Sequence, residues 1–228
     1  PDLPFDSGTY HYETYHENAG ENYLIPLEIV FRDTVPVGSS LRKRTDPADH
    51  DLSFASWPEG TVKLPEPVIE FSTKYEKQDR YLTREEAETI AGRASIDRLE
   101  SIALEVDQLL TRQADRAGFL HEDGKIECLY YQGDIRVADV VGTFDENRYA
   151  YEDQELSKEV LRQYHKRTQP EWVEAVAEAK ERAVAEDIAD WKSLVDLEPE
   201  PLSPDVIETA RDLYCAGTNT YIGRSVFD

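Results

Sequence analysis

The stretch that begins at residue 96 constrains the fold of this chain most, because its apolar residues recur every three or four positions. Such spacing is that of an α-helix with one apolar face, and Gly118 should end the helix. A helix of this kind buries its apolar face, so we expect it to cover a sheet. The residues that keep the period are Ile96, Leu99, Ile102, Ala103, Val106, Leu109 and Leu110.

Strands for that sheet are predicted on both sides of the helix. Residues 23–31 form an apolar, β-rich run, and residues 64–71 read as a strand whose prolines place it at a sheet edge or a strand start. Residues 125–131 and 134–141 are predicted to form a hairpin around Gln132-Gly133. These runs indicate an antiparallel arrangement rather than a helical bundle.

Further helices are expected after the hairpin, at about 157–166 and 171–194, and a last one capped by Ser203 and ended by Gly217. A capping-box pattern from Thr83 to Glu86 starts a shorter helix before residue 96. The fold class is therefore α/β in the broad sense, more narrowly α+β. We divide the chain into an irregular leader (1–22), a sheet-containing domain (23–156) and a helical C-terminal part (157–228) packed on the same domain.

The composition is strongly acidic, with 48 Asp and Glu against 25 Lys and Arg and a formal net charge of -23. Such a chain repels nucleic-acid phosphates and anionic lipid surfaces, so neither is expected as a partner. The acidic residues are spread along the chain, which indicates a halophilic host. The alternative is disorder, but 39% apolar residues and 13 Tyr favour a folded core.

Cys128 and Cys215 lie far apart without metal-ligand spacing, so neither a zinc site nor a disulfide framework is predicted. No apolar run reaches the roughly 20 residues of a membrane helix. A soluble protein of the reducing cytoplasm fits these features best. The chain contains no methionine, even at position 1, and we therefore expect it to begin inside a longer gene product.

Two groups of residues have the chemistry of a binding site. Arg32, at the end of a predicted strand, is followed by Gly38-Ser39-Ser40 and the basic cluster Arg42-Lys43-Arg44. A guanidinium, backbone N–H groups and hydroxyls are suited to a phosphate monoester. The alternative is a turn followed by a solvated run of charge.

In the second group, strand alternation places Asp123, Lys125 and Glu127 on one face. With a hairpin loop of three residues, Glu127 would lie opposite Asp139. Such a carboxylate pair repels unless a cation lies between the two groups, and Mg²⁺ with nucleotide phosphates is the usual solution. The alternative is an ordinary polar face of an exposed hairpin. Arg148 follows nine residues after Asp139 and could return to the same place.

Four segments together, IPLEIVFRDTVPVGSSLRKR, LPEPVIEFSTKYEKQD, AGFLHEDGKIE and GDIRVADVVGTFDENRY, resemble the phosphoribosylaminoimidazole-succinocarboxamide synthase family over about residues 25–149. The resemblance implies the antiparallel, ATP-grasp-like sheet of that family. It also implies an ATP- and Mg²⁺-dependent ligase that joins L-aspartate to the carboxylate of carboxyaminoimidazole ribotide in purine synthesis. The reaction would pass through an acyl phosphate. The family's N-terminal lobe, with its Gly-Lys-x-Lys loop over ATP, has no match in this sequence.

By the same resemblance, Lys125 and Asp123 are catalytic, Glu127 and Asp139 hold Mg²⁺ and the ATP phosphates, and Lys74 and Asp79 bind aspartate. The substrate phosphate is bound by Arg32, Ser39, Arg44 and Arg148.

Two other functions stay open from the sequence. One is a non-catalytic relative that binds the ribotide or a nucleotide without turnover, and the other is a salt-adapted interaction module. The sequence leaves the oligomeric state open, a homo-oligomer included.

Overall fold

The computed structural model describes residues 2–6, 8–152, 154–186, 188 and 190–227. A six-stranded antiparallel sheet is its centre, with the strand order β4-β3-β5-β7-β8 and β6 paired to β5. The strands of this sheet are β3 (Tyr23–Val35), β4 (Val62–Thr73), β5 (Leu120–Tyr131), β6 (Asp134–Ala138), β7 (Asn147–Tyr151) and β8 (Gln154–Glu155). The predicted α+β class with an antiparallel sheet is confirmed.

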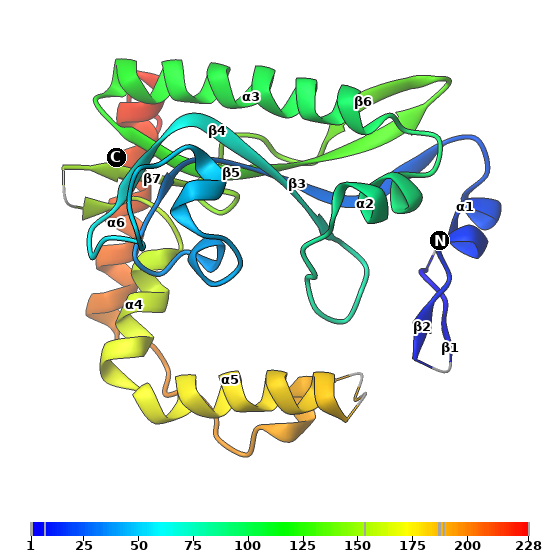
Figure 1. Cartoon of the computed structure of the whole chain (residues 1–228). Coiled ribbons are helices and arrows are strands. Elements are labelled where there is room, and N and C mark those ends of the chain that lie inside the picture. The colour runs from blue at the N-terminus through cyan, green and yellow to red at the C-terminus, as the bar shows by residue number, and fades with distance from the viewer. Residues whose placement is uncertain (1, 7, 153, 187, 189, 228) are drawn as a thin grey trace.

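Helices lie on both sides of the sheet (Figure 1). The α-helices are α1 (Tyr12–Ala19), α2 (Arg84–Ala91), α3 (Ile96–Ala117), α4 (Glu159–Thr168), α5 (Pro170–Ala185) and α6 (Pro204–Ile222). In Figure 1, α3 runs along one side of the sheet, whereas α4 and α5 lie on the other side. Short 3₁₀ helices occupy Ser40–Lys43, Pro47–His50 and Trp191–Leu194.

The main core lies between the sheet and the helices α2 and α3. Alternate residues of β3, namely Leu27, Ile29 and Phe31, are fully buried there against Leu99 and Ala103 of α3. This alternation of buried residues on a strand and the three-to-four spacing on the helix match the two secondary-structure periods. The predicted amphipathic helix and its role as a cover of the sheet are therefore confirmed, and Gly118 caps it with a positive φ of 76°.

Several element boundaries differ from expectation, since the helix expected at 171–194 ends at Ala185 and the strand expected at 134–141 ends at Ala138. The leader contains a short hairpin of β1 (Phe5–Asp6) and β2 (Thr9–Tyr10) followed by α1, where an irregular segment was predicted. Tyr15 is the one buried residue of α1, and its hydroxyl donates to the Leu24 carbonyl oxygen at 2.7 Å. Tyr12 and Ala19 also pack on the core, and His16 Nε2 lies 2.9 Å from the Ile90 carbonyl oxygen. These residues keep helical spacing with Tyr15, but few of them are strongly apolar, so the segment was predicted as irregular.

The last helix also runs further than predicted, because α6 continues through Gly217 to Ile222. Gly217 is buried in the helix interior, where a Cβ atom would lie 2.8 Å from Phe144 Cε2. Close packing of two elements, rather than helix termination, explains this glycine.

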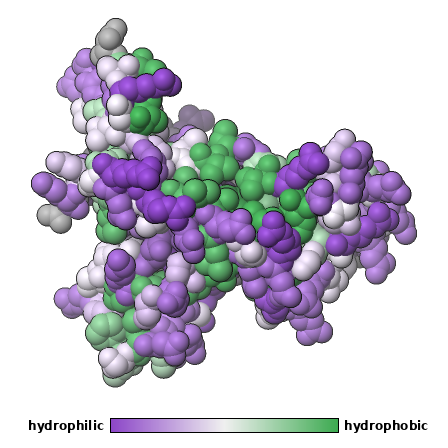
Figure 2. All heavy atoms as spheres, turned by 90° about the horizontal axis from the view of Figure 1, so that it is seen from above, coloured by the Kyte–Doolittle hydropathy of each residue, from purple (hydrophilic) through white to green (hydrophobic). Residues whose placement is uncertain are grey.

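The edge position of β4 and the capping box of Thr83 and Glu86 are as predicted. Within the described residues, no helix combines the length and the apolar character needed to cross a bilayer. Hydrophilic side chains dominate the surface seen from above, and hydrophobic ones gather near its middle (Figure 2). Cys128 is a buried free thiol and Cys215 a partly buried one.

Candidate functional site

The sheet face opposite α3 is polar, and it places the predicted site residues side by side. On β3 and β5, residues two apart share this face. The cross-strand partners are Glu28 with Glu127, Val30 with Lys125, and Arg32 with Asp123. The predicted common face of Asp123, Lys125 and Glu127 is therefore present, and β3 adds Glu28 and Arg32 to it.

Asp123 joins the two arginines that were predicted to bind a phosphate. Its Oδ2 accepts from Arg32 Nη1 at 2.8 Å, and its Oδ1 accepts from Arg148 Nε at 2.8 Å. Arg148 comes from β7, which pairs with β5 so that Arg148 lies opposite Asp123. Three strands thus bring two guanidinium groups to one carboxylate, and the distant Arg148 does return to this face.

Arg32 is almost completely buried, with 4% of its surface exposed. Its Nε donates to Glu70 Oε2 at 2.7 Å and its Nη2 to the Tyr81 hydroxyl at 2.9 Å. Burial opposes its charge, but Asp123 and then Glu70 outweigh that effect and raise the pKa of Arg32. The guanidinium is therefore held rigidly and fully charged.

Arg44 reaches the same cluster from the loop after β3. It forms an ion pair with Glu70, and its guanidinium carbon lies 3.5 Å from the centre of the Tyr81 ring. Glu70 thus links Arg44 to Arg32. Arg44 is not among the residues that line the cleft described below, so a direct contact with a phosphate there stays a prediction.

Lys125 lies between two carboxylates. Its Nζ is 2.6 Å from Glu28 Oε1 and 3.1 Å from Glu146 Oε2. Burial lowers the pKa of this amine, but the hydrogen bonds and charges of Glu28 and Glu146 outweigh burial and raise it. Lys125 is therefore a positive charge fixed in the middle of the polar face.

The predicted pair of Glu127 and Asp139 has a different geometry from the one expected. The hairpin loop holds two residues, Gln132 and Gly133, both with positive φ, as in a type I′ turn. Glu127 consequently lies opposite Ala138, and its carboxylate pairs with Lys74. Asp139 follows the end of β6 in a left-handed conformation, with φ of 63°. The three-residue loop was wrong, because the sequence did not show which turn type Gln132-Gly133 adopts.

A cleft of about 510 Å³ is lined by this face, by the loop that follows β3 and by residues between positions 144 and 166. Ser39 lines it, and its Oγ accepts from Leu41 N at 3.3 Å, which fixes the turn. Two cations of α4, Arg162 and Lys166, also line it, and sequence reasoning missed both. The predicted residues in the lining are Arg32, Ser39, Asp79, Asp123, Lys125 and Arg148, whereas Arg44, Lys74, Glu127 and Asp139 are outside it.

Several acidic partners were also missed. Glu28, Glu70 and Glu146 hold the cations of the cleft in place. For Glu28 and Glu70 a signal existed, since each falls on the polar side of a predicted strand by simple alternation. Glu146 lies in a loop, where no period could indicate its direction.

The SAICAR synthetase family model matches residues 17–179 of this chain. The chain belongs to the SAICAR synthetase family. Among relatives of this family, a protein from Archaeoglobus fulgidus is 38% identical over 215 residues, covering 91% of this chain and 61% of the relative. A phosphoribosylaminoimidazole-succinocarboxamide synthase from Thermoplasma acidophilum is 34% identical over 208 residues, covering 84% of this chain and 65% of that protein. The chain thus spans less than two thirds of the length of either relative.

Solved SAICAR synthetases agree with the fold. The Saccharomyces cerevisiae enzyme, solved in complex with SAICAR, has a TM-score of 0.62 and 18% identity, with 100% of this chain and 76% of that chain covered. A SAICAR synthetase solved in complex with ADP has a TM-score of 0.51 and 31% identity, with 61% of this chain and 56% of that chain covered. The family resemblance stated from the sequence is confirmed.

Proposed function

We propose that this SAICAR synthetase family member carries the ligase chemistry of its family. It would use ATP to activate the carboxylate of carboxyaminoimidazole ribotide as an acyl phosphate and join L-aspartate to it through an amide bond. The observation that carries the proposal is the convergence of Arg32, Asp123 and Arg148 beside Lys125 in one cleft. We place the reaction in the cytoplasm, where the reducing conditions suit two free thiols.

The cleft offers a phosphate-binding end. Arg148 keeps 24% of its side chain exposed, and Ser39 belongs to the same lining. We assign the ribotide phosphate to this end, where Arg32 and the α4 cations strengthen the positive field. Each charged hydrogen bond to the phosphate would contribute about 1.5–3 kcal/mol to binding.

The reacting carboxylate would then lie beside Lys125. Phosphoryl transfer needs in-line positioning and charge neutralisation rather than covalent help from the protein. The fixed ammonium of Lys125 supplies that charge next to the transferring group. The aspartate amine would attack the acyl phosphate, with phosphate as the leaving group, and Lys74 and Asp79 are the residues we assign to aspartate.

The residues present fit Mg²⁺, the metal that the family implies. Glu28 and Glu127 are direct cross-strand partners, and two carboxylates so placed repel each other without cations nearby. In the described chain Lys125 and Lys74 neutralise them. We assign Glu127, and Asp139 one residue beyond its cross-strand partner Ala138, as the hard oxygen ligands that would hold the ion. Bound Mg²⁺ would neutralise the phosphates of ATP.

Turnover by the full chain tests the proposal. The chain is incubated with ATP, Mg²⁺, L-aspartate and carboxyaminoimidazole ribotide in concentrated KCl, and ADP and the amide product are quantified. We expect both products in equal amounts, and a loss of about 10²–10³-fold in kcat for Lys125→Ala with ribotide binding retained. Ribotide binding without any product would instead identify a non-catalytic relative. Turnover by Lys125→Ala at the wild-type rate would remove Lys125 from the mechanism.

A further inference from the structure

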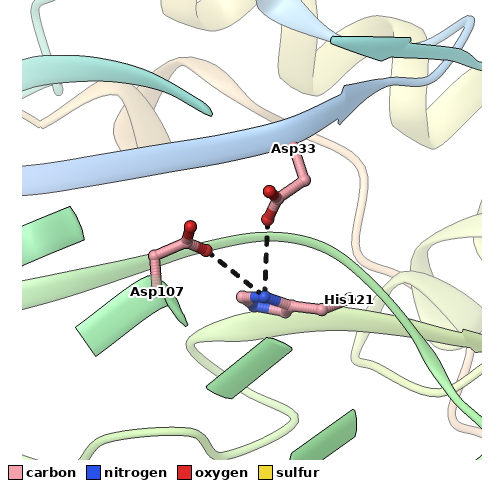
Figure 3. Close-up of side chains that lie close together, drawn as sticks. All are labelled: Asp33, Asp107 and His121. Atoms are coloured by element: carbon pink, nitrogen blue, oxygen red, sulfur yellow. Dashed lines mark ion pairs between the residues drawn. The ribbon is translucent and has the colours of Figure 1, made fainter. Parts of the chain in front are cut away.

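A second cluster lies on the opposite face of the same strands, behind the arginines. Asp33 of β3, Asp107 of α3 and His121 of β5 point their polar atoms at one another (Figure 3). One oxygen of each carboxylate and the ring nitrogen all lie within 4.8 Å of one another. Asp107 and His121 are buried, with 1% and 2% of their surfaces exposed. No role for this cluster follows from the ligase chemistry.

The tautomer of His121 is set by Asn147. Nε2 of the ring lies 3.1 Å from Asn147 Oδ1, while the Asn147 amide nitrogen donates to the Thr143 carbonyl oxygen. The amide oxygen therefore faces the ring, and Nε2 must carry the proton. This leaves Nδ1 without a proton, as an acceptor close to the two aspartates and to the Thr111 hydroxyl. A histidine whose second nitrogen is held by an outer partner in this way has the arrangement of a metal ligand.

The backbone leaves room for that outer partner. A Cβ atom at Gly124 would lie 1.9 Å from Asn147 Oδ1, so any other residue at this position would displace Asn147. The glycine in the middle of β5 thus preserves the hydrogen bond that orients His121.

Three hydrogen-bond acceptors therefore lie close together with too few donors to satisfy them. Nδ1 of His121 lies 3.5 Å from Asp33 Oδ2 and 3.4 Å from Asp107 Oδ1. In the described part of the chain, neither of these oxygens has a hydrogen-bond partner. The hydroxyl of Thr111, 2.8 Å from Nδ1, can donate to the ring but leaves these two carboxylate oxygens without a donor. A buried, unpaired oxygen such as that of Asp107 is costly without a cation.

The two distances are compatible with ligands that share one metal ion. Hydrogen bonds of this kind measure roughly 2.7–3.2 Å, shorter than the values observed. Two ligands bonded to one Zn²⁺ at about 2.0–2.1 Å with tetrahedral angles are separated by about 3.4 Å. An imidazole with two carboxylates is also a ligand set that suits zinc and neighbouring transition metals better than Mg²⁺.

We propose that Asp33, Asp107 and His121 bind a divalent transition metal ion, with Zn²⁺ as the best-fitting candidate. The ion would join β3, α3 and β5. Asp33 is next to Arg32 in the chain, His121 lies two residues before Asp123, and Asn147 precedes Arg148. The ion would therefore brace the strands that hold the arginines.

A proton is the competing occupant. Burial, followed by the negative charge of Asp33, raises the pKa of Asp107 to about 8, so protonation of Asp107 could also relieve the repulsion. If the site binds a metal ion, added Zn²⁺ should bind tightly, whereas if a proton on Asp107 fills this role, Zn²⁺ should not bind there.

Zinc binding to the full chain tests the site directly. The chelator-treated protein is titrated with Zn²⁺ in the presence of excess Mg²⁺, which competes for carboxylate sites elsewhere on the chain, and free Zn²⁺ is followed with an indicator dye. We expect one tight equivalent per chain, and binding weakened by about 100-fold or more in Asp107→Asn and in Asp33→Asn. Zn²⁺ should also raise the melting temperature of the wild type but not of these variants.

Asp107→Asn keeps the side-chain shape and removes a buried charge, so the variant should fold. Glu105→Gln is the matched control, since Glu105 is an exposed carboxylate of the same helix, and it should bind Zn²⁺ like the wild type. Absence of the tight equivalent in the wild type, or equal affinity in Asp107→Asn, would overturn the proposal. Because metal binding is measured, that outcome would leave the ligase function untouched.

Discussion

At the scale of single residues, Glu122 and Glu155 form an interacting pair of carboxyl groups that the proposed ligase chemistry does not use. Glu122 sits at an irregularity between His121 and Asp123, where the register of β5 against β7 shifts. Burial, followed by the charge of Glu155, raises the pKa of Glu122 to about 7, although Arg148 opposes this shift. The carboxyl therefore stays protonated in the folded protein at mildly acidic pH.

This shift predicts a pH-dependent stability. Between about pH 4.5 and pH 7 the folded state holds a proton that the unfolded state has released, so the stability from this group falls as pH rises through that window. Glu122→Gln removes the titration. We expect it to exceed the wild type by on the order of 1–3 kcal/mol at pH 8, with the difference shrinking toward pH 4. Urea unfolding at several pH values measures this, and a difference that does not change with pH would contradict it.

The sequence predicted which residue types lie in the cleft better than it predicted the ion pairs among them. Asp123, Lys125 and Glu127 could be placed on one face because strand alternation is a local rule. That Asp123 accepts from two arginines depends on the order of three strands, which no local pattern contains. Arg44 was predicted to bind the substrate phosphate, but it pairs with Glu70 of β4 and is not part of the cleft lining. No local pattern could indicate this partner.

At the scale of elements, the packing of α6 against Phe144 explains a glycine that the sequence pattern misassigned. Replacing Gly by Ala inside a helix ordinarily stabilises by about 1 kcal/mol. At Gly217 the added Cβ would lie 2.8 Å from Phe144 Cε2, so overpacking opposes that gain. Helix termination and close packing of two elements both favour glycine, so the sequence alone does not show which of the two explains Gly217.

A double-mutant cycle separates the two effects. We expect Gly217→Ala to destabilise the chain by about 1–3 kcal/mol in the wild-type background. In a Phe144→Leu background the clash is gone, and the same change should be neutral or stabilising. Thermal unfolding of the four proteins provides the measurement. An equal effect of Gly217→Ala in both backgrounds would show that Phe144 is not the cause.

The long periodic elements were the predictable ones. The helix that begins at Ile96 buries one regular set of side chains, and the strand that begins at Tyr23 is a nearly continuous apolar run, so both could be recognised from the sequence. The helix of residues 12–19 contacts the core through Tyr12, Tyr15 and Ala19, a short and weakly apolar set that the sequence pattern did not single out. The two-residue hairpin loop depends on a turn conformation, which leaves no periodic pattern.

At the scale of the whole molecule, the net charge of -23 sets the conditions under which the chain folds. Repulsion among carboxylates destabilises the compact state, and 1 M salt reduces the Debye length to roughly 3 Å. We expect the melting temperature to rise between low and high KCl by roughly 5–10 °C, which corresponds to a few kcal/mol for a chain of this size. A melting temperature independent of KCl would refute the halophilic interpretation.

The central claim is that the cations gathered around Asp123 form the substrate site. Calorimetric titration of the full chain with carboxyaminoimidazole ribotide in concentrated KCl tests it most directly, with Arg148→Ala as the comparison. The account predicts binding by the wild type and an affinity lower by at least about tenfold in the variant, since a charged hydrogen bond to phosphate is lost. Equal affinity in the two proteins, or no binding by the wild type, would contradict it.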